Sequence, residues 1–202
     1  MDKKELMQKI RALRDETGIS FMEIRKALEA ANGDMDEARK ILRQRGIQIA
    51  AKKAHREARE GLIGAYIHFS GRLGSLVEVN CETDFVARTP EFKQLVDEIA
   101  LQVAGMMPRY IRREDVPESE IQRLRTEFEE TIAGDIPEAH REQAWQRYLE
   151  RFYSETCLLE QPLIRDQSRT VRDLVTEAIT KLGENIVIRR FIRFELGEDA
   201  DT

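Results

Sequence analysis

The sequence predicts an α+β fold, in which a small N-terminal three-helix module precedes an antiparallel three-stranded sheet packed with helices. Three observations predict it. Apolar residues recur at steps of three and four within residues 1–46, which indicates short helices. The runs 62–69 and 76–80 flank a glycine-bracketed turn, which is typical of a β-hairpin. The polar stretch 117–159 has helical spacing and breaks once near its middle, which indicates a long helical hairpin.

Each of the three expected N-terminal helices begins at a capping pair. The pairs are Asp2 and Glu5, Ser20 and Glu23, and Asp34 and Glu37. Gly18 and Gly46 are the expected C-terminal ends of the first and third helices. Because the resulting core is small and holds no catalytic group, a docking module is expected. Its apolar positions are Leu6, Ile10, Leu13, Met22, Ile24, Ala27, Leu28, Met35, Ala38, Ile41 and Leu42.

The remaining apolar patterns indicate two helices and a last strand. Pro90 is expected to open a helix that runs to about Met107. Thr170 begins the clearest helix of the sequence, and Gly183 ends it. Residues 186–196 alternate as a strand. One face of this strand is expected to carry Ile186, Ile188, Ile192, Phe194 and Leu196.

Composition and charge exclude several classes of protein. Of the 202 residues 41% are hydrophobic, and the formal net charge is −5. An acidic balance argues against a general nucleic-acid-binding protein, so no direct nucleic-acid partner is expected. No apolar run approaches the ~20 residues that cross a bilayer. The start lacks a secretory signal, and its Asp2 and Glu5 are atypical of a mitochondrial transit peptide. A soluble cytoplasmic protein without a membrane contact is therefore expected.

The cysteines and histidines predict neither a metal site nor a cofactor site. The two cysteines, Cys81 and Cys157, stand far apart, and the three histidines show no metal-ligand spacing. No glycine pattern of a phosphate-binding loop is present. Cys81 with His68 as its base would be the nucleophile of an enzyme, but a small buried residue is the more typical role of such a cysteine. Cys157 either cross-links subunits or, in a reducing cytoplasm, stays a free thiol.

Two segments leave their roles open. The Ala-rich segment 47–59 carries Lys52, Lys53, Arg56 and Arg59, so it is either a basic contact for an acidic partner or RNA, or a solvated helical linker. The helical hairpin within 117–159 is either a partner surface or an internally packed element. A plain binding protein that uses only the three-helix module is the alternative from another class of function.

The segment 79–88 carries the strongest functional signal. Thr83 can cap a short helical turn, and Asp84 then lies in its first turn, where the helix dipole favours a negative charge. Phe85 follows at once. One interpretation is a strand-to-helix connection whose phenylalanine fills a local gap. The other is an exposed aromatic wedge beside an acid, presented on a rigid turn, and aromatic residues of this kind anchor interfaces.

The sequence resembles bacterial elongation factor Ts, the family of guanine-nucleotide exchange factors of elongation factor Tu. The most specific matching segments are GRLGSLVEVNCETDFVAR at 71–88 and TVRDLVTEAITKLGENIVIRRFIRFELG at 170–197. The N-terminal helices look like the ubiquitin-associated-like module of that family. A departure occurs where the family commonly has TGAGMMDCKKAL, since this chain has TGISFMEIRKAL at 17–28. The stretch 105–157 matches only in its helical character.

The resemblance implies a function and a set of site residues. The chain would be a translation elongation factor that binds elongation factor Tu–GDP and promotes GDP release by displacing the Mg²⁺ of the partner, with no covalent chemistry of its own. The segment that dislocates Mg²⁺ would be Thr83, Asp84, Phe85 and Val86. The docking loop of the N-terminal module would be Thr17, Gly18, Ile19, Ser20, Phe21 and Met22. A chain with a single core is similar to family members that form homodimers, which implies a 2:2 complex.

These inferences together predict a division of the chain into domains. Residues 1–46 form the docking module, and residues 47–59 form a helical or basic linker. Residues 60–197 form the core and dimerisation domain, and residues 198–202 form a flexible acidic tail.

Overall fold

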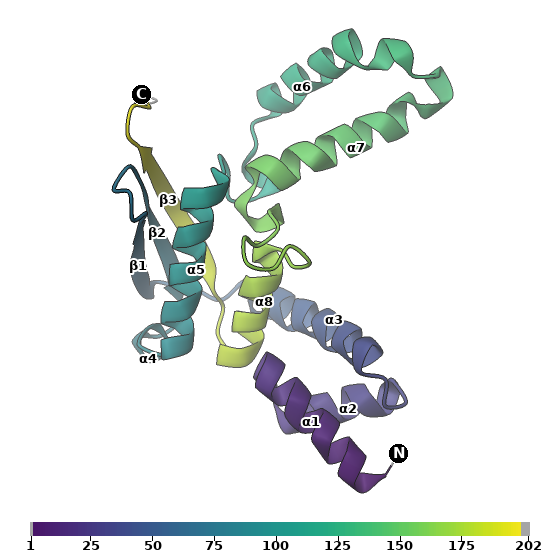
Figure 1. The fold of residues 1–202 in the computed structure, drawn as a ribbon, viewed down its shortest axis with the longest axis vertical. Helices are drawn as coiled ribbons and strands as arrows, with labels where there is room; N and C mark the ends of the chain where they lie inside the picture. The colour runs from purple at the N-terminus through teal and green to yellow at the C-terminus, as the bar shows by residue number, and fades with distance from the viewer. Residues whose placement is uncertain (1, 199–202) are drawn as a thin grey trace. The chain divides into compact units, whose positions relative to one another are not determined.

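The computed structural model describes residues 2–198 and, within them, contains eight α-helices, three short 3₁₀ helices and three strands (Figure 1). The chain forms two compact units. The first unit takes its described residues from Met1–Gly64, Glu78–Val96 and Asp173–Arg189. The second unit takes them from Ala65–Val77, Asp97–Arg172 and Arg190–Thr202. Of the expected acidic tail, 199–202 lie outside the described residues, whereas Glu198 accepts a hydrogen bond from Arg193 at 2.9 Å.

The N-terminal three-helix module comprises α1 (Lys3–Thr17), α2 (Phe21–Ala30) and α3 (Met35–Lys53). Two of the expected caps are confirmed, because Ser20 accepts from the N–H of Glu23 at 3.4 Å and Asp34 from that of Glu37 at 2.8 Å. Asp2 stands at the N-cap of α1, but its side chain makes no capping bond. Met22, which the sequence places among the apolar positions of the module, is exposed. The buried core consists of Ile10, Leu13, Ile24, Ala27, Leu28, Ala31, Ala38 and Leu42.

Gly46 does not end the third helix as the sequence predicts. α3 continues to Lys53, and Gly46 is buried in its interior. A Cβ at this position would lie 3.2 Å from Thr180 Oγ1 and 3.4 Å from Thr176 Cγ2, both in α8 (Val171–Leu182). The glycine therefore permits a close approach of α3 and α8. The packing between them stabilises α3 at this position more than the low helix propensity of glycine destabilises it. A bidentate ion pair between Arg43 and Asp173, at 3.0 and 2.7 Å, joins the same two helices.

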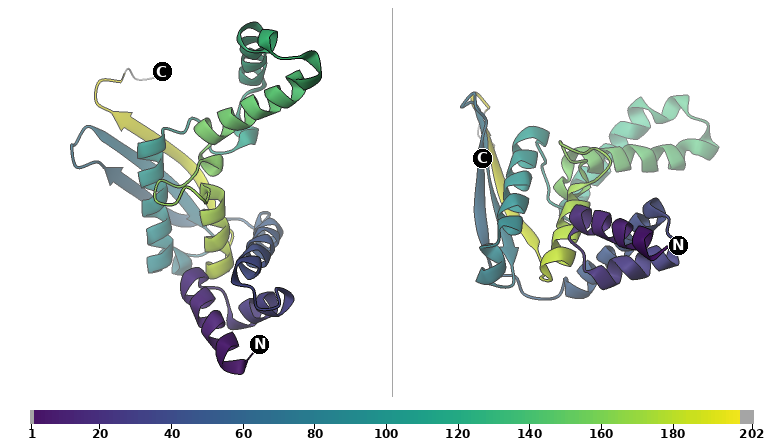
Figure 2. Two further views of the ribbon diagram at one scale, coloured as in Figure 1. Left: turned by 45° about the vertical axis from the view of Figure 1, so that its right-hand side comes forward. Right: turned by 60° about the horizontal axis from the view of Figure 1, so that its bottom comes forward.

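The three strands form one antiparallel sheet in the order β1-β2-β3 (Figures 1 and 2). They are β1 (Glu60–Ile67), β2 (Leu73–Cys81) and β3 (Val187–Glu195). Ser75 Oγ in β2 donates to the carbonyl oxygen of Ala100, 2.7 Å away in α5 (Pro90–Met106). The odd-numbered residues of β2 therefore face α5, and Leu76 faces away from it. The structure combines an antiparallel sheet with helices, which confirms the predicted α+β class.

The alternation of β3 differs from the prediction. Ile188 is buried as expected, but Ile192 and Phe194 are exposed. Arg193 Nε donates to the carbonyl oxygen of Ala104 in α5 at 3.2 Å, so its even-numbered neighbours point away from that helix. The burial pattern shifts by one residue at two consecutive exposed arginines, 189 and 190, as it does at a β-bulge.

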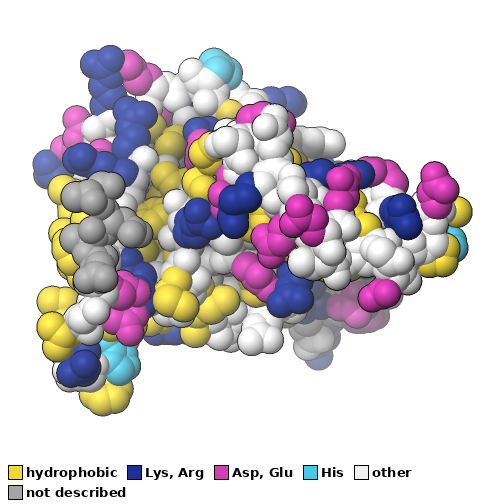
Figure 3. Space-filling view, turned by 90° about the horizontal axis from the view of Figure 1, so that it is seen from above, with side chains coloured by type: hydrophobic (Ala, Val, Ile, Leu, Met, Phe, Trp, Pro, Cys, Tyr) yellow, Lys and Arg dark blue, Asp and Glu magenta, His cyan; other side chains and the backbone are white. Residues whose placement is uncertain are grey.

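This shift leaves an apolar surface on the second unit. The hairpin register, fixed by the hydrogen bond from His68 N–H to the carbonyl oxygen of Leu73 at 2.9 Å, places Ile67 on the same side as Leu76. Hydrophobic side chains gather along the left edge of Figure 3, over the sheet. We define the outer face as the exposed residues Ile67, Leu76, Ile192 and Phe194.

The helical hairpin consists of α6 (Glu118–Thr131) and α7 (Glu138–Thr156), joined through η2 (Ala133–Asp135). Its apolar residues pack against one another, with the rings of Phe128 and Trp145 at 5.6 Å between centroids. Internal packing therefore accounts for the spacing that the sequence shows. The buried members of this cluster are Leu124, Phe128, Ala133, Trp145 and Phe152.

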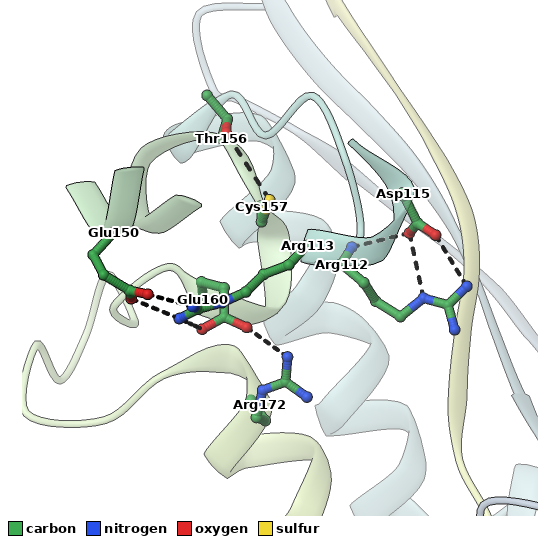
Figure 4. A network of polar contacts seen from close by, with 8 residues as sticks. All are labelled: Arg112, Arg113, Asp115, Glu150, Thr156, Cys157, Glu160 and Arg172. Carbon is green, nitrogen blue, oxygen red and sulfur yellow. Dashed lines mark hydrogen bonds and ion pairs between the residues drawn. The ribbon is translucent and has the colours of Figure 1, made fainter. Parts of the chain in front are cut away.

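An ion-pair network lies at the base of the hairpin (Figure 4). Arg113, in η1 (Arg113–Asp115), binds both carboxylate oxygens of Glu150 at 2.6 and 2.8 Å and one of Glu160 at 2.9 Å. Glu160, in η3 (Leu158–Glu160), also accepts from Arg172 at 2.5 Å. Burial opposes ionisation of Glu160, but the hydrogen bonds from the two arginines hold its pKa below the usual range. The network thus contributes stability at neutral pH, which is lost as pH falls through that lowered pKa.

Replacing Gly46 by leucine should lower the stability of the protein. Overpacking against α8 destabilises by about 1–3 kcal/mol, which exceeds the gain of up to about 1 kcal/mol in helix propensity. Urea unfolding followed by circular dichroism should show a lower midpoint for Gly46→Leu. Gly134→Leu is the matched control, since nothing lies within 4 Å of a Cβ there. Equal midpoints for the two variants would contradict tight packing of α3 on α8.

Candidate functional site

The segment after β2 forms a single turn of helix, α4 (Asp84–Ala87). Thr83 is its N-cap, with an extended backbone, and its hydroxyl accepts from the N–H of Val86 at 3.4 Å. Asp84 lies in the first turn and pairs with Arg88 at 2.7 Å. The cap and the acidic first turn are therefore confirmed, and the strand-to-helix connection has the local chemistry that the sequence predicts.

Phe85 does not fill a gap in the core. Its side chain is 80% exposed, whereas Ala87 is 4% exposed and is the residue that the turn buries. Two residues apart on a helix lie about 200° apart around the axis. A one-turn helix that buries Ala87 therefore directs Phe85 outward. The interpretation of Phe85 as a local filler is wrong, and an aromatic ring stands beside a carboxylate on the surface of the first unit.

A remote segment holds the start of this turn. Glu184 is the second residue after α8. Its carboxylate accepts from the N–H groups of Glu82 and Thr83, both at 3.0 Å, and from the hydroxyl of Thr83 at 2.6 Å. The sequence argument missed Glu184, which stands 101 positions after Thr83. The only sequence signal was the polar tripeptide GEN between an amphipathic helix and a strand, inside the second resembling segment.

The predicted docking loop lies between α1 and α2. Gly18 ends α1 in the left-handed conformation with φ 66°, and its N–H donates to the carbonyl oxygen of Arg14 at 2.8 Å. The N–H of Ile19 donates to the hydroxyl of Thr17 at 3.3 Å. A Cβ on Gly18 would lie 2.7 Å from Cε of Lys181 in α8, so this loop runs directly against that helix. Met22, in the first turn of α2, is 55% exposed.

The two predicted site segments are separate surfaces of the first unit. In the part of the chain that the structure describes, no hydrogen bond or ion pair joins 17–22 to 83–86. In Figure 1 and in the right-hand view of Figure 2, α8 lies between α4 and the three-helix module. The last turn of α8 contacts one through Lys181 beside Gly18, and the chain just after α8 contacts the other through Glu184 at Thr83. One helix thus sets the spacing of the two surfaces.

Cys81 has the surroundings of a structural residue. It is fully buried, and its Sγ donates to the carbonyl oxygen of Thr83 at 3.2 Å. Burial, with a smaller contribution from the carboxylate of Glu184, raises the pKa of this thiol to about 11. A nucleophilic cysteine needs the opposite shift. His68, the proposed base of the enzyme alternative, forms a hydrogen bond between its Nδ1 and Oγ of Ser70 at 2.8 Å.

The segment 83–86 presents an exposed aromatic ring beside a carboxylate on the surface of the first unit. Among residues 2–198, no group of three or more His, Cys, Asp or Glu side chains could hold a metal ion. No helix in the same range is long and apolar enough to cross a membrane. An exposed aromatic ring beside a carboxylate on a fixed turn, with a helical module at a set spacing, is typical of a protein that acts by binding another macromolecule.

Comparison with known proteins identifies the class. The family model described as elongation factor TS matches residues 4–198. A curated elongation factor Ts of Thermoanaerobacter sp. (strain X514) is 52% identical over 196 residues, which cover 96% of each chain. That of Methylacidiphilum infernorum is 49% identical over 192 residues, or 95% of each chain. That of Thermodesulfovibrio yellowstonii is 46% identical over 194 residues, or 96% of this chain and 97% of its own.

These matches define a translation elongation factor. The chain belongs to the elongation factor Ts family, because the family model spans nearly its whole length and its relatives are about half identical from end to end.

Both thiols should resist alkylation in the folded protein. Cys81 and Cys157 are fully buried, and burial raises the pKa of each thiol. A pKa of about 11 at Cys81 leaves only about one thiolate in a thousand at pH 8. A maleimide at pH 8, followed by mass spectrometry, should label neither residue rapidly, while both should react at once in guanidinium chloride. Fast labelling of Cys81 in the folded chain would contradict its assignment as a structural residue.

Proposed function

We propose that this protein is a guanine-nucleotide exchange factor that binds elongation factor Tu–GDP, promotes release of GDP and allows GTP to rebind. Membership of the elongation factor Ts family supports the proposal. The observation that carries it is the exposure of Phe85 on a capped turn. Exposure of an apolar ring of this size to water costs free energy, which is recovered when a partner buries the ring. The protein works in the cytoplasm and performs no covalent chemistry itself.

The thermodynamics of exchange define what this surface must do. A factor can displace a tightly bound nucleotide only by binding the nucleotide-free partner better than the nucleotide-bound one. The coupling is reciprocal, so GDP weakens binding of the factor by the same ratio. Each tenfold weakening of GDP needs about 1.4 kcal/mol of differential binding. Burial of one phenylalanine ring supplies about 1.5–3 kcal/mol.

The exchange segment is Thr83, Asp84, Phe85 and Val86. Phe85 inserts between helices of the nucleotide-binding domain of the partner. Asp84 enters the same region as a carboxylate and disturbs the groups that hold Mg²⁺, which belongs to the partner. Loss of Mg²⁺ removes charge neutralisation from the β-phosphate and so loosens GDP. Asp84 forms an exposed ion pair with Arg88. Surface ion pairs contribute little free energy, so Asp84 can leave Arg88 and bind groups of the elongation factor instead.

The N-terminal module docks on another part of the same nucleotide-binding domain. Its contact residues are those of the loop 17–22, in which Met22 presents an exposed apolar side chain. Residues 1–46 act as the docking module, 47–59 as the linker and 60–197 as the core, which grips the remaining domains of the partner. Because Lys181 of α8 lies beside Gly18, the module and the exchange segment meet the partner as two surfaces of the same unit.

Phe85→Ala should slow GDP release more than it weakens binding. Removal of the ring takes away interactions made only with the nucleotide-free state, so the stimulated rate at saturating factor should fall by about tenfold or more. The measurement is release of fluorescent GDP from elongation factor Tu. Phe69→Ala is the matched control, since Phe69 is also an exposed phenylalanine and lies in the β1–β2 turn. A wild-type rate in Phe85→Ala would remove the wedge from the mechanism.

The protein acts as a homodimer, so that two copies bind two copies of the partner. The outer face supports this proposal, because Ile67, Leu76, Ile192 and Phe194 form an exposed apolar surface on the second unit. Contiguous apolar patches on soluble proteins mark interaction sites. A second copy is the occupant that we propose, since a two-fold axis brings the same apolar residues of both chains together and matches them by symmetry.

Ile192→Asp should convert the dimer to a monomer. The substitution buries a carboxylate in an apolar interface, which costs several kcal/mol, whereas the isolated chain tolerates it on an exposed strand. Sedimentation velocity at micromolar concentration measures the change. Ile47→Asp in α3 is the matched control, because Ile47 is 53% exposed and Ile192 is 48% exposed. Equal sedimentation of the wild-type protein and Ile192→Asp would move the dimer contact elsewhere or remove it.

A further inference from the structure

Glu184 accepts three hydrogen bonds from the start of the exchange segment, although it is distant from that segment in sequence. One of its carboxylate oxygens accepts from two consecutive backbone N–H groups, those of Glu82 and Thr83, at 3.0 Å each. The other accepts from the hydroxyl of Thr83 at 2.6 Å. Hydrogen bonds to an ionised acceptor are about twice as strong as neutral ones. The carboxylate therefore fixes both the backbone and the cap of the turn that presents Phe85.

The contact is reciprocal. Glu82 accepts from the N–H of Asn185 at 2.6 Å, so each segment supplies a carboxylate to the backbone of the other. Asn185 also donates through its side chain to the carbonyl oxygen of Arg56 at 2.7 Å, and the guanidinium of Arg56 lies 3.5 Å from Glu82. The start of the exchange segment is thereby tied to the α8–β3 connection and to the chain after α3.

The turn depends on this support because it is very short. A helix of four residues closes few hydrogen bonds of its own and is unstable in isolation. Its cap bond, from Val86 N–H to the hydroxyl of Thr83, is long at 3.4 Å. Glu184 takes up the hydroxyl hydrogen of Thr83, which leaves an oxygen lone pair for Val86. Removal of the carboxylate frees that hydroxyl to rotate and weakens the cap.

We infer that Glu184 is a positioning residue of the exchange site, which acts through Thr83 to hold Asp84 and Phe85 in the conformation that enters the partner. The inference rests on the proposed exchange function. Glu184 itself need not contact the partner. Its substitution should change the rate of exchange at saturation, because fewer bound molecules have the turn in place, while docking through 17–22 and the core is retained.

The test measures GDP release from elongation factor Tu with variants of the full-length protein at Glu184, at Thr83 and at a control position. It includes the double variant Glu184→Gln/Thr83→Val. Glu184→Ala removes all three hydrogen bonds. Glu184→Gln keeps the shape and one acceptor oxygen. Its amide nitrogen cannot accept a hydrogen bond, so either the Thr83 hydroxyl or the two backbone N–H groups lose their acceptor. Thr83→Val removes the cap without changing the size of the side chain. Glu91→Ala is the matched control, because Glu91 is an exposed acid of the same unit that pairs only distantly, at 3.7 Å, with Lys181.

We expect Glu184→Ala to lower the saturated release rate by about tenfold and to change the half-saturating concentration by less than about twofold. Glu184→Gln and Thr83→Val should each lower the rate, and the double variant should be no slower than the slower single one, since both act on the same cap. Glu91→Ala should keep the wild-type rate. Amide hydrogen exchange at Val86 and Ala87 should accelerate in Glu184→Gln and not in Glu91→Ala.

Other results would overturn the inference. If Glu184→Gln and Thr83→Val lower the rate by factors that multiply in the double variant, the two residues act independently and Glu184 does not work through the cap. If both Glu184 variants keep the wild-type saturated rate, the carboxylate has no positioning role, although the exchange function stands. If the wild-type protein fails to accelerate GDP release, the proposed function falls, and amide exchange at Val86 still decides whether Glu184 orders the turn.

Discussion

The arrangement of the first unit depends on three residues between α8 and β3. The carbonyl oxygen of Gly183 accepts from Lys53 at the end of α3, Glu184 takes up the backbone and hydroxyl of Thr83, and Asn185 bonds Glu82 and Arg56. Three segments that are distant in sequence therefore meet at one short connection. A phenylalanine can stand exposed on a single turn of helix because this connection, and not the turn itself, fixes its conformation.

The same helix also supports the N-terminal module. A three-helix bundle of about 50 residues buries too little surface to be more than marginally stable alone. α3 extends past its own bundle and packs on α8 through Gly46, where the bidentate pair of Arg43 with Asp173 adds a charged contact. The loop 17–22 thus contacts α8 through Lys181, and the turn at 83–86 is bonded by Glu184 just after the same helix.

Local signals in the sequence predicted local structure. The caps at Ser20, Asp34 and Thr83 act within three residues of themselves, and each forms as expected. Predictions failed where tertiary contacts decide. Gly46 looked like a helix end, but the close approach of α8 keeps it inside α3. The strict alternation expected of β3 breaks at two arginines that no local pattern distinguishes. The residues of the exchange segment came from the family resemblance, whereas the exposure of Phe85 and the role of Glu184 needed the three-dimensional structure.

The distance between Thr83 and Glu184 along the chain has a consequence for synthesis. The turn leaves the ribosome 101 residues before the carboxylate that orders it. At about 5–20 residues per second, this corresponds to a delay of about 5–20 seconds. During that interval the nascent chain carries Phe85 on a segment without its support. The turn that carries Phe85 therefore gains the hydrogen bonds of Glu184 only when the chain just before its last strand emerges.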